Sequence, residues 1–485
     1  MPLPAPSSPP ARPDRPRRAS SSSAPALRRP LGLLALAAAA AVAGCATASS
    51  GPPAASRAPA SEDAAPPAAL AAGGAGAAAF AAAPATVPSP APPPDASAAA
   101  SAAESAARLA SEEADFGRWV EAFQRRAAAQ GIRPATLRDA FDRVRFQPRV
   151  IELDRSQPEF TRQVWDYLDG AVSAQRVAQG RAKLQQYRAE TAQAESRYGV
   201  PAAVLVAIWG MESNYGGNFG NFSTIDALAT LGFEGRRREW AASELLAALK
   251  IIGSGDIDRS RMIGSWAGAM GHTQFLPSSY LGYAVDADGD GRRDIWGSIP
   301  DVMASTANYL ARSGWQPGQP WGAEVRLPAG FDYERADTAL RQPTRQWAAA
   351  GVMPLDGQAL PDFPDGSIIA PAGARGPAFL VGPNFRAILR YNNSNSYALG
   401  VSLLAQRIEG GPGVVGAWPR DLKSLSRTQV RALQAALNDR GFGTGTPDGV
   451  MGPATRDGVR RYQRSAGLPV DGFPTVELLQ QLQAP

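Results

Sequence analysis

The feature that most constrains what this chain can fold into is a tract from Ala46 to about Ala110, built mainly from Ala, Pro, Ser and Gly. Such a tract holds too few large apolar side chains to offset the conformational entropy lost on folding. We therefore predict a disordered linker over residues 45–112, with a root-mean-square reach of roughly 45 Å. Ordinary globular sequence begins near Glu112, so the folded part of the chain is expected to follow it.

The front of the chain has the pattern of a secretory signal. Residues 12–29 are basic, and the apolar run Leu31–Ala43 is too short to span a bilayer stably. Small residues then precede Cys45, an arrangement that resembles the lipobox of bacterial lipoproteins. We predict a signal peptide at 1–44, lipidation of Cys45 and, because Ala46 follows it, an anchor on the periplasmic face of the outer membrane. A buried structural cysteine is the alternative.

The net charge of +5 resides entirely in that signal. Residues 1–45 hold six arginines and one acid, and the rest of the chain holds 43 basic and 43 acidic residues. A balanced remainder gives no support for a phosphate-binding surface, so we predict no nucleic-acid partner. Cys45 is the only cysteine and His272 the only histidine. An internal disulfide and a CxxC zinc site are therefore excluded.

Apolar spacing after Glu112 predicts a mainly α fold. Trp119, Phe123 and Ala127 fit one helix face, and residues 171–198 form a long polar helical run. Pro201 then opens another helix, at a position where its missing N–H costs nothing.

Glu212 continues the apolar face of the helix that Pro201 opens. It follows Leu205, Ile208 and Trp209 in an i, i+3, i+4, i+7 series, and the turn residues 214–217 end the helix directly after it. A carboxyl on an apolar face points toward the core, where desolvation raises its pKa and suits it to general acid catalysis. The alternative is a buried structural glutamate paired with an arginine of the run 236–238.

The run Glu212-Ser213-Asn214-Tyr215-Gly216 resembles the catalytic signature of lytic transglycosylases with a lysozyme-like fold, specifically the membrane-bound lytic murein transglycosylase B family. Further matching blocks follow in the expected order: Ser223–Thr230, Ser265–Gly271, Gln274–Ser279 and Arg390–Ala398. The resemblance covers roughly residues 115–410 and implies a catalytic domain at 113–412 with Glu212 as its acid/base.

The resemblance also implies a set of side chains that line a glycan cleft. These are Ser265, Gln274, Tyr391, Asn392 and Tyr397. Their chemistry suits sugars, because tyrosine rings stack on the apolar faces of pyranoses and amides bond hydroxyl or acetamido groups. The resemblance gives His272 no catalytic role, and we expect a structural imidazole there.

The reaction that the family implies uses one carboxylate rather than the usual two. Glu212 would protonate the bond between N-acetylmuramic acid and N-acetylglucosamine, and the muramyl acetamido group would stabilise C1. Glu212 would then accept the proton of the C6 hydroxyl as a 1,6-anhydromuramyl end forms. Whether Asp226 could serve as a second carboxylate can be judged only from the three-dimensional structure. A lysozyme-like hydrolase and an inert wall-binding scaffold are the alternatives.

An acidic loop that starts at Asp286 matches the first nine positions of an EF-hand. Acids occupy positions 1, 3, 5 and 9, and a glycine at position 6 allows the sharp turn. Position 12, normally Glu, is Gly297 here. The predicted ligands of a structural calcium ion are Asp286, Asp288, Asp290, the backbone carbonyl of Arg292, and Asp301. No cofactor is expected for the chemistry itself, and a solvated acidic turn is the alternative.

The last segment, residues 420–485, carries three amphipathic helical patterns separated by Gly-rich turns. Its ordered motifs, among them Asp448-Gly449 and Asp471-Gly472, resemble the three-helix peptidoglycan-binding domain attached to many wall enzymes. A generic helical bundle is the alternative. The partner implied by both folded domains is the glycan strand of peptidoglycan, reached by an enzyme tethered to the membrane.

Overall fold

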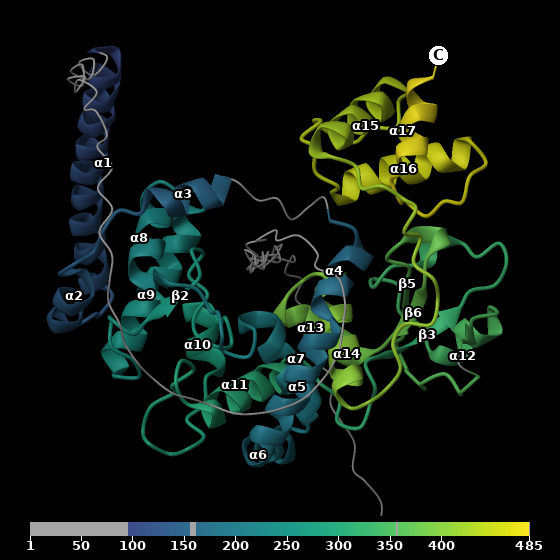
Figure 1. Ribbon diagram of the computed structural model, residues 1–485, viewed down its shortest axis with the longest axis horizontal. Helices are drawn as coiled ribbons and strands as arrows, with labels where there is room; N and C mark the ends of the chain where they lie inside the picture. The colour runs from purple at the N-terminus through teal and green to yellow at the C-terminus, as the bar shows by residue number, and fades with distance from the viewer. Residues whose placement is uncertain (1–95, 156–161, 356, 485) are drawn as a thin grey trace, which may run out of the picture. The chain divides into compact units, whose positions relative to one another are not determined.

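The computed structural model describes residues 96–155, 162–355 and 357–484, and helices dominate them (Figure 1). The helices are α1 (Ala96–Ala129), α2 (Pro134–Phe141), α3 (Pro148–Arg155), α4 (Val164–Ala171), α5 (Ala174–Gln186), α6 (Arg188–Tyr198), α7 (Ala202–Ser213), α8 (Thr224–Phe233), α9 (Arg238–Ser254), α10 (Pro277–Tyr283), α11 (Ile299–Arg312), α12 (Thr344–Ala349), α13 (Pro383–Tyr391), α14 (Asn395–Ile408), α15 (Arg427–Asp439), α16 (Pro453–Ser465) and α17 (Val476–Gln483). The strands are β1 (Phe222–Ser223), β2 (Ile263–Gly264), β3 (Gly322–Arg326), β4 (Met353–Pro354), β5 (Ser367–Ile369) and β6 (Ala378–Val381). The predicted mainly α fold is confirmed.

Helix α7 is a core helix, and it contacts α5, α6, α11 and α14. Every residue of the run 205–209 is 2% exposed or less. A helix that is apolar on all sides is stable only when other elements surround it. It begins directly after Pro201, as the sequence predicted. Its last turn therefore carries Glu212 into the interior.

Helix α1 begins earlier than the predicted end of the linker. The composition assigned residues 45–112 to a disordered linker, yet residues 96–112 are helical. The physical reason is the high helix propensity of alanine, supported by an i, i+4 ion pair between Arg108 and Glu112. Further along α1, Phe123 and Ala127 are buried on one face.

The polar run 171–198 is two helices rather than one. The chain breaks at Tyr187, whose φ of −112° and ψ of 36° end α5 and start α6. The ring of Tyr187 packs edge-on against Trp209 with centroids 5.6 Å apart. Tertiary packing onto α7 thus interrupts a run in which the local sequence favours continuous helix.

A small antiparallel sheet follows α11, with strand order β4-β3-β6-β5. Val325 pairs with Ala378, and Ile368 pairs with Leu380. The sheet has its own core, which includes the fully buried Trp347. Strands this short give no period-2 signal, so the sequence did not predict them. Strand β6 leads directly into α13, and the sheet thereby fixes the start of that helix.

The C-terminal residues form the predicted three-helix unit from α15, α16 and α17. Its core consists of Leu425, Val430, Leu433, Leu437, Val459, Tyr462, Leu478, Leu479 and Leu482. The Gln434 side chain bonds Asp448 and the backbone of Gly449, and Gln463 bonds Asp471 and Gly472 in the same way. These two buried amides hold the Asp-Gly turns between the helices.

Within the part of the chain that the structure describes, no helix is both long enough and apolar enough to cross a bilayer. The predicted signal peptide at 1–44, Cys45 and most of the predicted linker lie outside the described residues.

Candidate active site

Glu212 lies at the end of α7 and is 6% exposed. The hydroxyl of Tyr397, on α14, donates a hydrogen bond of 2.5 Å to its Oε1. Burial raises the pKa of Glu212 to about 7, and the hydrogen bond from Tyr397 partly opposes that rise. A large fraction of this carboxyl is therefore protonated near neutral pH, as an acid catalyst requires.

Two of the three arginines that were the structural alternative for Glu212 pair with a different acid. Arg236 and Arg237 both pair with Asp154, at 3.2 and 3.7 Å. The partner of Glu212 is a neutral phenol instead of a cation. An arginine partner would have lowered the pKa of the carboxyl, whereas this environment leaves it raised.

The turn after Glu212 places two residues in the left-handed region. Asn214 has φ 50° and Tyr215 has φ 58°, both unusual for side chains other than glycine. The hydroxyl of Tyr215 turns back to donate to the carbonyl of Arg176 at 2.7 Å. Its ring also lies over Gly210, where an added Cβ would come within 2.5 Å of it. The backbone is thus held in a sharp, costly turn directly beside the carboxyl.

Two tyrosines predicted for the cleft lie close to Glu212. Burial, and next the charge of Glu212, raise the pKa of Tyr391 and of Tyr397 well above the ordinary value of 10. Both therefore remain hydrogen-bond donors. The Tyr391 hydroxyl donates to the carbonyl of Thr273 at 2.6 Å, and its ring lies 4.8 Å from that of Tyr309.

Ser265 and Gln274 belong to one tight segment after β2. The Ser265 hydroxyl accepts from the N–H of Ala269 at 3.1 Å. Gln274 has φ 51°, and its Nε2 donates to the carbonyls of Phe219 and Gly271 at 3.0 and 2.9 Å. Because both amide hydrogens are used, its carbonyl oxygen is the group left to accept a hydrogen bond from a sugar hydroxyl.

Asn392 is the half-buried residue at which α13 ends, directly after Tyr391. Among the contacts found for the described residues, none joins Ser265, Gln274 or Asn392 directly to Glu212. The structure therefore brings Tyr391 and Tyr397 to the carboxyl, and it leaves the glycan-binding roles of the other three as predictions.

Asp226, the other acid in question, is held by a cation. Its Oδ1 accepts from Arg259 at 2.8 Å. Burial raises its pKa, and the charge of Arg259 opposes that rise. This ion pair does not involve Glu212, so the carboxyl at the end of α7 has no second carboxylate beside it among its contacts in the described residues.

A family model described as "Transglycosylase SLT domain" matches residues 115–406, which is more than half of the chain. The chain belongs to this transglycosylase family. A second model, described as "Putative peptidoglycan binding domain", matches residues 426–482. The predicted membership of a lytic transglycosylase family, with a peptidoglycan-binding domain at the C-terminus, is confirmed.

Similar proteins from two bacteria illustrate this membership. Membrane-bound lytic murein transglycosylase B of Escherichia coli is 36% identical over 244 residues; the match spans 49% of this chain and 65%, less than two thirds, of that protein. SltB3 of Pseudomonas aeruginosa, in complex with NAG-anhNAM-pentapeptide, is 53% identical with a TM-score of 0.74, covering 76% of this chain and 99% of that one. Lytic transglycosylase Slt35 of E. coli, in complex with calcium, is 31% identical with a TM-score of 0.53, covering 61% and 93%.

Sequence patterns assigned His272 of the transglycosylase domain no catalytic role, and in the structure its ring lies against Trp209 of α7. Its Nδ1 accepts from the indole N–H of Trp209 at 3.1 Å, and the two rings stack. Burial lowers the pKa of His272 to about 4, so the imidazole is neutral at pH 7. An added Cβ at Gly216 would come within 2.5 Å of its ring. His272 thus supports both the helix and the turn that follows Glu212.

The acidic loop of the transglycosylase domain brings three predicted ligands together. Carboxylate oxygens of Asp286, Asp288 and Asp290 all lie within 4.8 Å of one another. Asp301 is not one of this group. Its side chain is buried, and its two oxygens accept from the N–H groups of Ala287 and Asp294, each at 2.7 Å. Through these two hydrogen bonds Asp301 holds the backbone of the loop, a role that sequence spacing could not reveal.

Arg292 contributes its backbone to the same loop. Its N–H donates to Oδ1 of Asp290 at 2.8 Å. Ser298, which the sequence did not single out, donates from its hydroxyl to Asp288 at 2.6 Å. A cluster of three carboxylates offers the hard oxygen ligands that calcium prefers.

Proposed function

We propose that this protein is a peptidoglycan lytic transglycosylase. It cleaves the β-1,4 bond between N-acetylmuramic acid and N-acetylglucosamine and leaves a 1,6-anhydromuramyl end. The observation that carries the proposal is the state of Glu212, a buried carboxyl with a pKa of about 7 at the end of a core helix. NAG-anhNAM-pentapeptide, the ligand in the SltB3 complex, is the type of product that this reaction leaves.

The first step transfers the proton of Glu212 to the glycosidic oxygen. The bond from that oxygen to muramyl C1 breaks, and the acetamido carbonyl of the same sugar bonds to C1, which gives an oxazolinium ion. Tyr397 donates to Oε1 of Glu212 and so stabilises the carboxylate that this step leaves. Hydrogen bonds to an ionised acceptor are stronger than those to a neutral one.

The second step uses the same carboxylate as a base. Glu212 accepts the proton of the C6 hydroxyl while O6 bonds to C1 and the bond from C1 to the acetamido oxygen breaks. The carboxyl is then protonated again and ready for another cycle. A group with a pKa near neutrality is suited to both roles, and the placement of Asp226 in an ion pair with Arg259 supports a mechanism with one carboxylate.

Hydrolysis is the competing outcome, because water could attack C1 in place of O6. Mass spectrometry of digested sacculi separates the two reactions. Anhydromuramyl ends are expected. Reducing muramyl ends would identify a hydrolase, and the absence of released fragments would identify a wall-binding scaffold.

The matched test of the residue is Glu212→Gln, which keeps the shape of the side chain and removes its titrating proton. We expect loss of cleavage with retained binding to sacculi. Glu244→Gln is the control, because Glu244 is also buried but its carboxylate accepts from the backbone and hydroxyl of Ser278. Turnover by Glu212→Gln at the wild-type rate would reject the assignment.

We also propose that the acidic loop binds a structural calcium ion. The clustered oxygens of Asp286, Asp288 and Asp290 fit a hard cation, and the carbonyl of Arg292 would add a ligand. Asp301 supports the loop through its backbone contacts. The bound ion would supply rigidity to the loop and no chemistry at Glu212. The calcium in the Slt35 complex supports this proposal.

The predicted lipid anchor at Cys45 and the outer-membrane location remain proposals as well. The name of the E. coli relative describes it as membrane-bound, which supports membrane association. Intact-mass analysis of the purified full chain tests the anchor. A diacylglyceryl adduct on Cys45, and release of Cys45→Ser into the soluble periplasm, are expected; an unmodified Cys45 in the mature protein would contradict it.

The C-terminal three-helix domain is proposed to hold the enzyme on its substrate. A weak binding module joined to a catalytic domain raises the local concentration of substrate. Deletion of residues 420–485 should weaken retention on sacculi while cleavage of soluble glycan continues. Equal retention of the shortened chain would count against a binding role.

A further inference from the structure

The imidazole of His272 lies between the helix that carries Glu212 and the turn that follows it. Its Nδ1 accepts from the indole N–H of Trp209, three residues before Glu212, and the two rings stack with centroids 5.8 Å apart. Its Cε1 lies 2.5 Å from the place that a Cβ would occupy on Gly216, in the turn. The ring therefore fills the space between two residues that flank the carboxyl in the sequence.

The hydrogen bond from Trp209 determines the form of this imidazole. An indole N–H can only donate, so Nδ1 of His272 is the acceptor and the hydrogen of the neutral ring resides on Nε2. Burial lowers the pKa of His272 to about 4; the charge of Asp294 opposes that change and the charge of Lys183 adds to it. The ring is therefore neutral, and its acceptor available, where Glu212 titrates near pH 7.

His272 also contacts the loop that continues the turn. Its ring lies 5.2 Å from that of Phe219, and the carbonyl of Phe219 accepts from the side chain of Gln274, two residues after His272. The backbone N–H of His272 donates to the carbonyl of Ile295 at 2.9 Å. The imidazole is thus attached to a fixed backbone, and the loop after Glu212 cannot move away from it without the loss of these contacts.

The exclusion of water is the main reason that Glu212 keeps its proton near neutral pH, because burial is the largest cause of its raised pKa. The titratable groups that surround it are the hydroxyls of Tyr391 on α13 and Tyr397 on α14, and both stay neutral. Arg176 of α5 donates to the side chain of the residue before Glu212. No second carboxylate is among these neighbours, so water that entered beside the turn would be the chief change if the imidazole were lost.

We propose that His272 is a positioning residue for Glu212: its imidazole keeps the turn 214–217 closed against α7 and keeps water away from the carboxyl. The inference rests on the proposed function and adds to it the residue that maintains the acid in its protonated form. The imidazole itself neither gives nor takes a proton in the reaction. Solvent that reaches Glu212 after removal of the ring should stabilise the carboxylate and so lower its pKa.

Two substitutions in the full-length protein separate the ring from its acceptor. His272→Asn keeps an acceptor near the position of Nδ1 and removes the rest of the ring, whereas His272→Phe keeps a ring and leaves the indole N–H of Trp209 without an acceptor. In His272→Asn the alkaline limb of kcat/KM on soluble glycan strands should move to lower pH by about one unit, which lowers kcat/KM at pH 8 roughly tenfold. His272→Phe should have a lower Tm and an alkaline limb close to that of the wild type.

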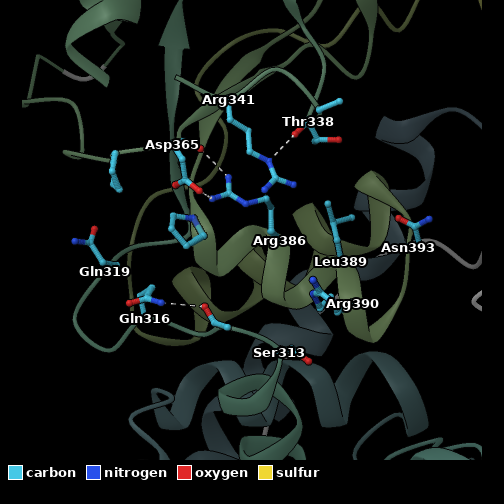
Figure 2. Close-up of a pocket in the computed structure, with 14 residues that line it drawn as sticks. Ser313, Gln316, Gln319, Thr338, Arg341, Asp365, Arg386, Leu389, Arg390 and Asn393 are labelled. Atoms are coloured by element: carbon cyan, nitrogen blue, oxygen red, sulfur yellow. Dashed lines mark hydrogen bonds and ion pairs between the residues drawn. The ribbon is translucent and has the colours of Figure 1, made fainter. Parts of the chain in front are cut away.

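The control is a substitution that weakens the fold away from Glu212. Asp365 pairs with Arg386 of α13 at 2.5 Å, and both line a polar pocket of about 780 Å³ (Figure 2). Neither Glu212 nor His272 lines that pocket. Asp365→Asn should therefore lower the Tm and leave the alkaline limb in place. A His272→Asn variant that behaves in the same way would assign the imidazole a packing role alone and would overturn the inference.

A spectroscopic measurement on the wild type needs no variant. Because His272 is the only histidine, NMR of the full-length protein labelled with ¹⁵N-histidine reports on this imidazole alone. The hydrogen should reside on Nε2 from pH 6 to pH 8, and a hydrogen on Nδ1 or a charged ring in that range would overturn the inference. A wild type that cleaves no glycan at any pH would instead overturn the proposed function, so the two failures are distinguishable.

Discussion

The hydroxyl of Tyr397 donates a 2.5 Å hydrogen bond to Oε1 of Glu212, although 185 residues separate the two in the chain. The hydrogen bond favours the carboxylate, whereas burial favours the neutral acid and is the larger effect. Their balance leaves the pKa near 7. The pair therefore sets the protonation state on which both steps of the proposed reaction depend.

Removal of that hydroxyl should shift the pH dependence of the reaction. Glu212 begins the cycle as an acid, so kcat/KM of the wild type should fall as the pH rises above about 7. In Tyr397→Phe the pKa of Glu212 should rise further, which moves this alkaline limb to higher pH. The rate at the optimum should fall roughly tenfold, because the carboxylate formed in the first step has lost its donor.

The pH profile of turnover on soluble glycan strands is the measurement. Tyr280→Phe is the control, because it removes another buried hydroxyl, one that donates to the carbonyl of Arg293. A Tyr397→Phe profile that keeps its alkaline limb in place would show that the phenol does not tune the acid.

Glu212→Gln should stabilise the protein in a pH-dependent way. The folded chain raises the pKa of Glu212 from 4.5 to about 7, so the folded state binds this proton more tightly than the unfolded state. The resulting stability is fully present below pH 4.5 and is lost as the pH rises through about 7. The variant escapes that loss, so at pH 8 it should be more stable than the wild type by roughly 3 kcal/mol.

Tryptophan fluorescence during urea denaturation measures this difference without interference from the C-terminal domain, because the last of the ten tryptophans is Trp418. The gain should shrink toward zero at pH 4.5. Glu121→Gln, on the exposed side of α1, serves as the control. Equal stabilities of Glu212→Gln and the wild type at pH 8 would mean that the carboxyl is not desolvated in solution.

A single methyl group at Gly210 should damage the turn beside the carboxyl of Glu212. The added Cβ would lie 2.5 Å from the buried ring of Tyr215, and overpacking of this kind costs about 1–3 kcal/mol. Gly117→Ala is the matched control, since nothing lies within 4 Å of the added atom on α1 and alanine favours helix. Thermal denaturation should give a lower Tm for Gly210→Ala and an unchanged or higher one for Gly117→Ala.

Local patterns in the sequence were sufficient to predict the helix that carries Glu212. The series from Leu205 to Glu212 has helical spacing, Pro201 marks its start, and the turn at 214–217 marks its end. Each of these signals depends on residues within a few positions of one another. The same is true of the three C-terminal helices, whose apolar faces and Gly-rich turns could be read directly.

Features that depend on distant parts of the chain could not be predicted in this way. The break at Tyr187 follows from packing onto Trp209, and the donor to Glu212 comes from α14. Asp301 was assigned as a ligand by its proximity in sequence, and only the fold shows it buried beneath the loop.

The burial of Asp301 gives it a role different from that of the three clustered carboxylates of the acidic loop. Asp288→Asn removes one of the clustered carboxylates and should abolish the rise in Tm that calcium gives, with little change when EGTA is present. Asp301→Asn should lower the Tm even with EGTA, because its two oxygens accept from the N–H groups of Ala287 and Asp294.

Calcium at a hundredfold excess over its Kd should stabilise the wild type by about 2.7 kcal/mol. Arg292→Ala should keep the full response, since only its backbone carbonyl is available to the ion. An identical Tm with calcium and with EGTA in the wild type would show that the loop is a solvated turn.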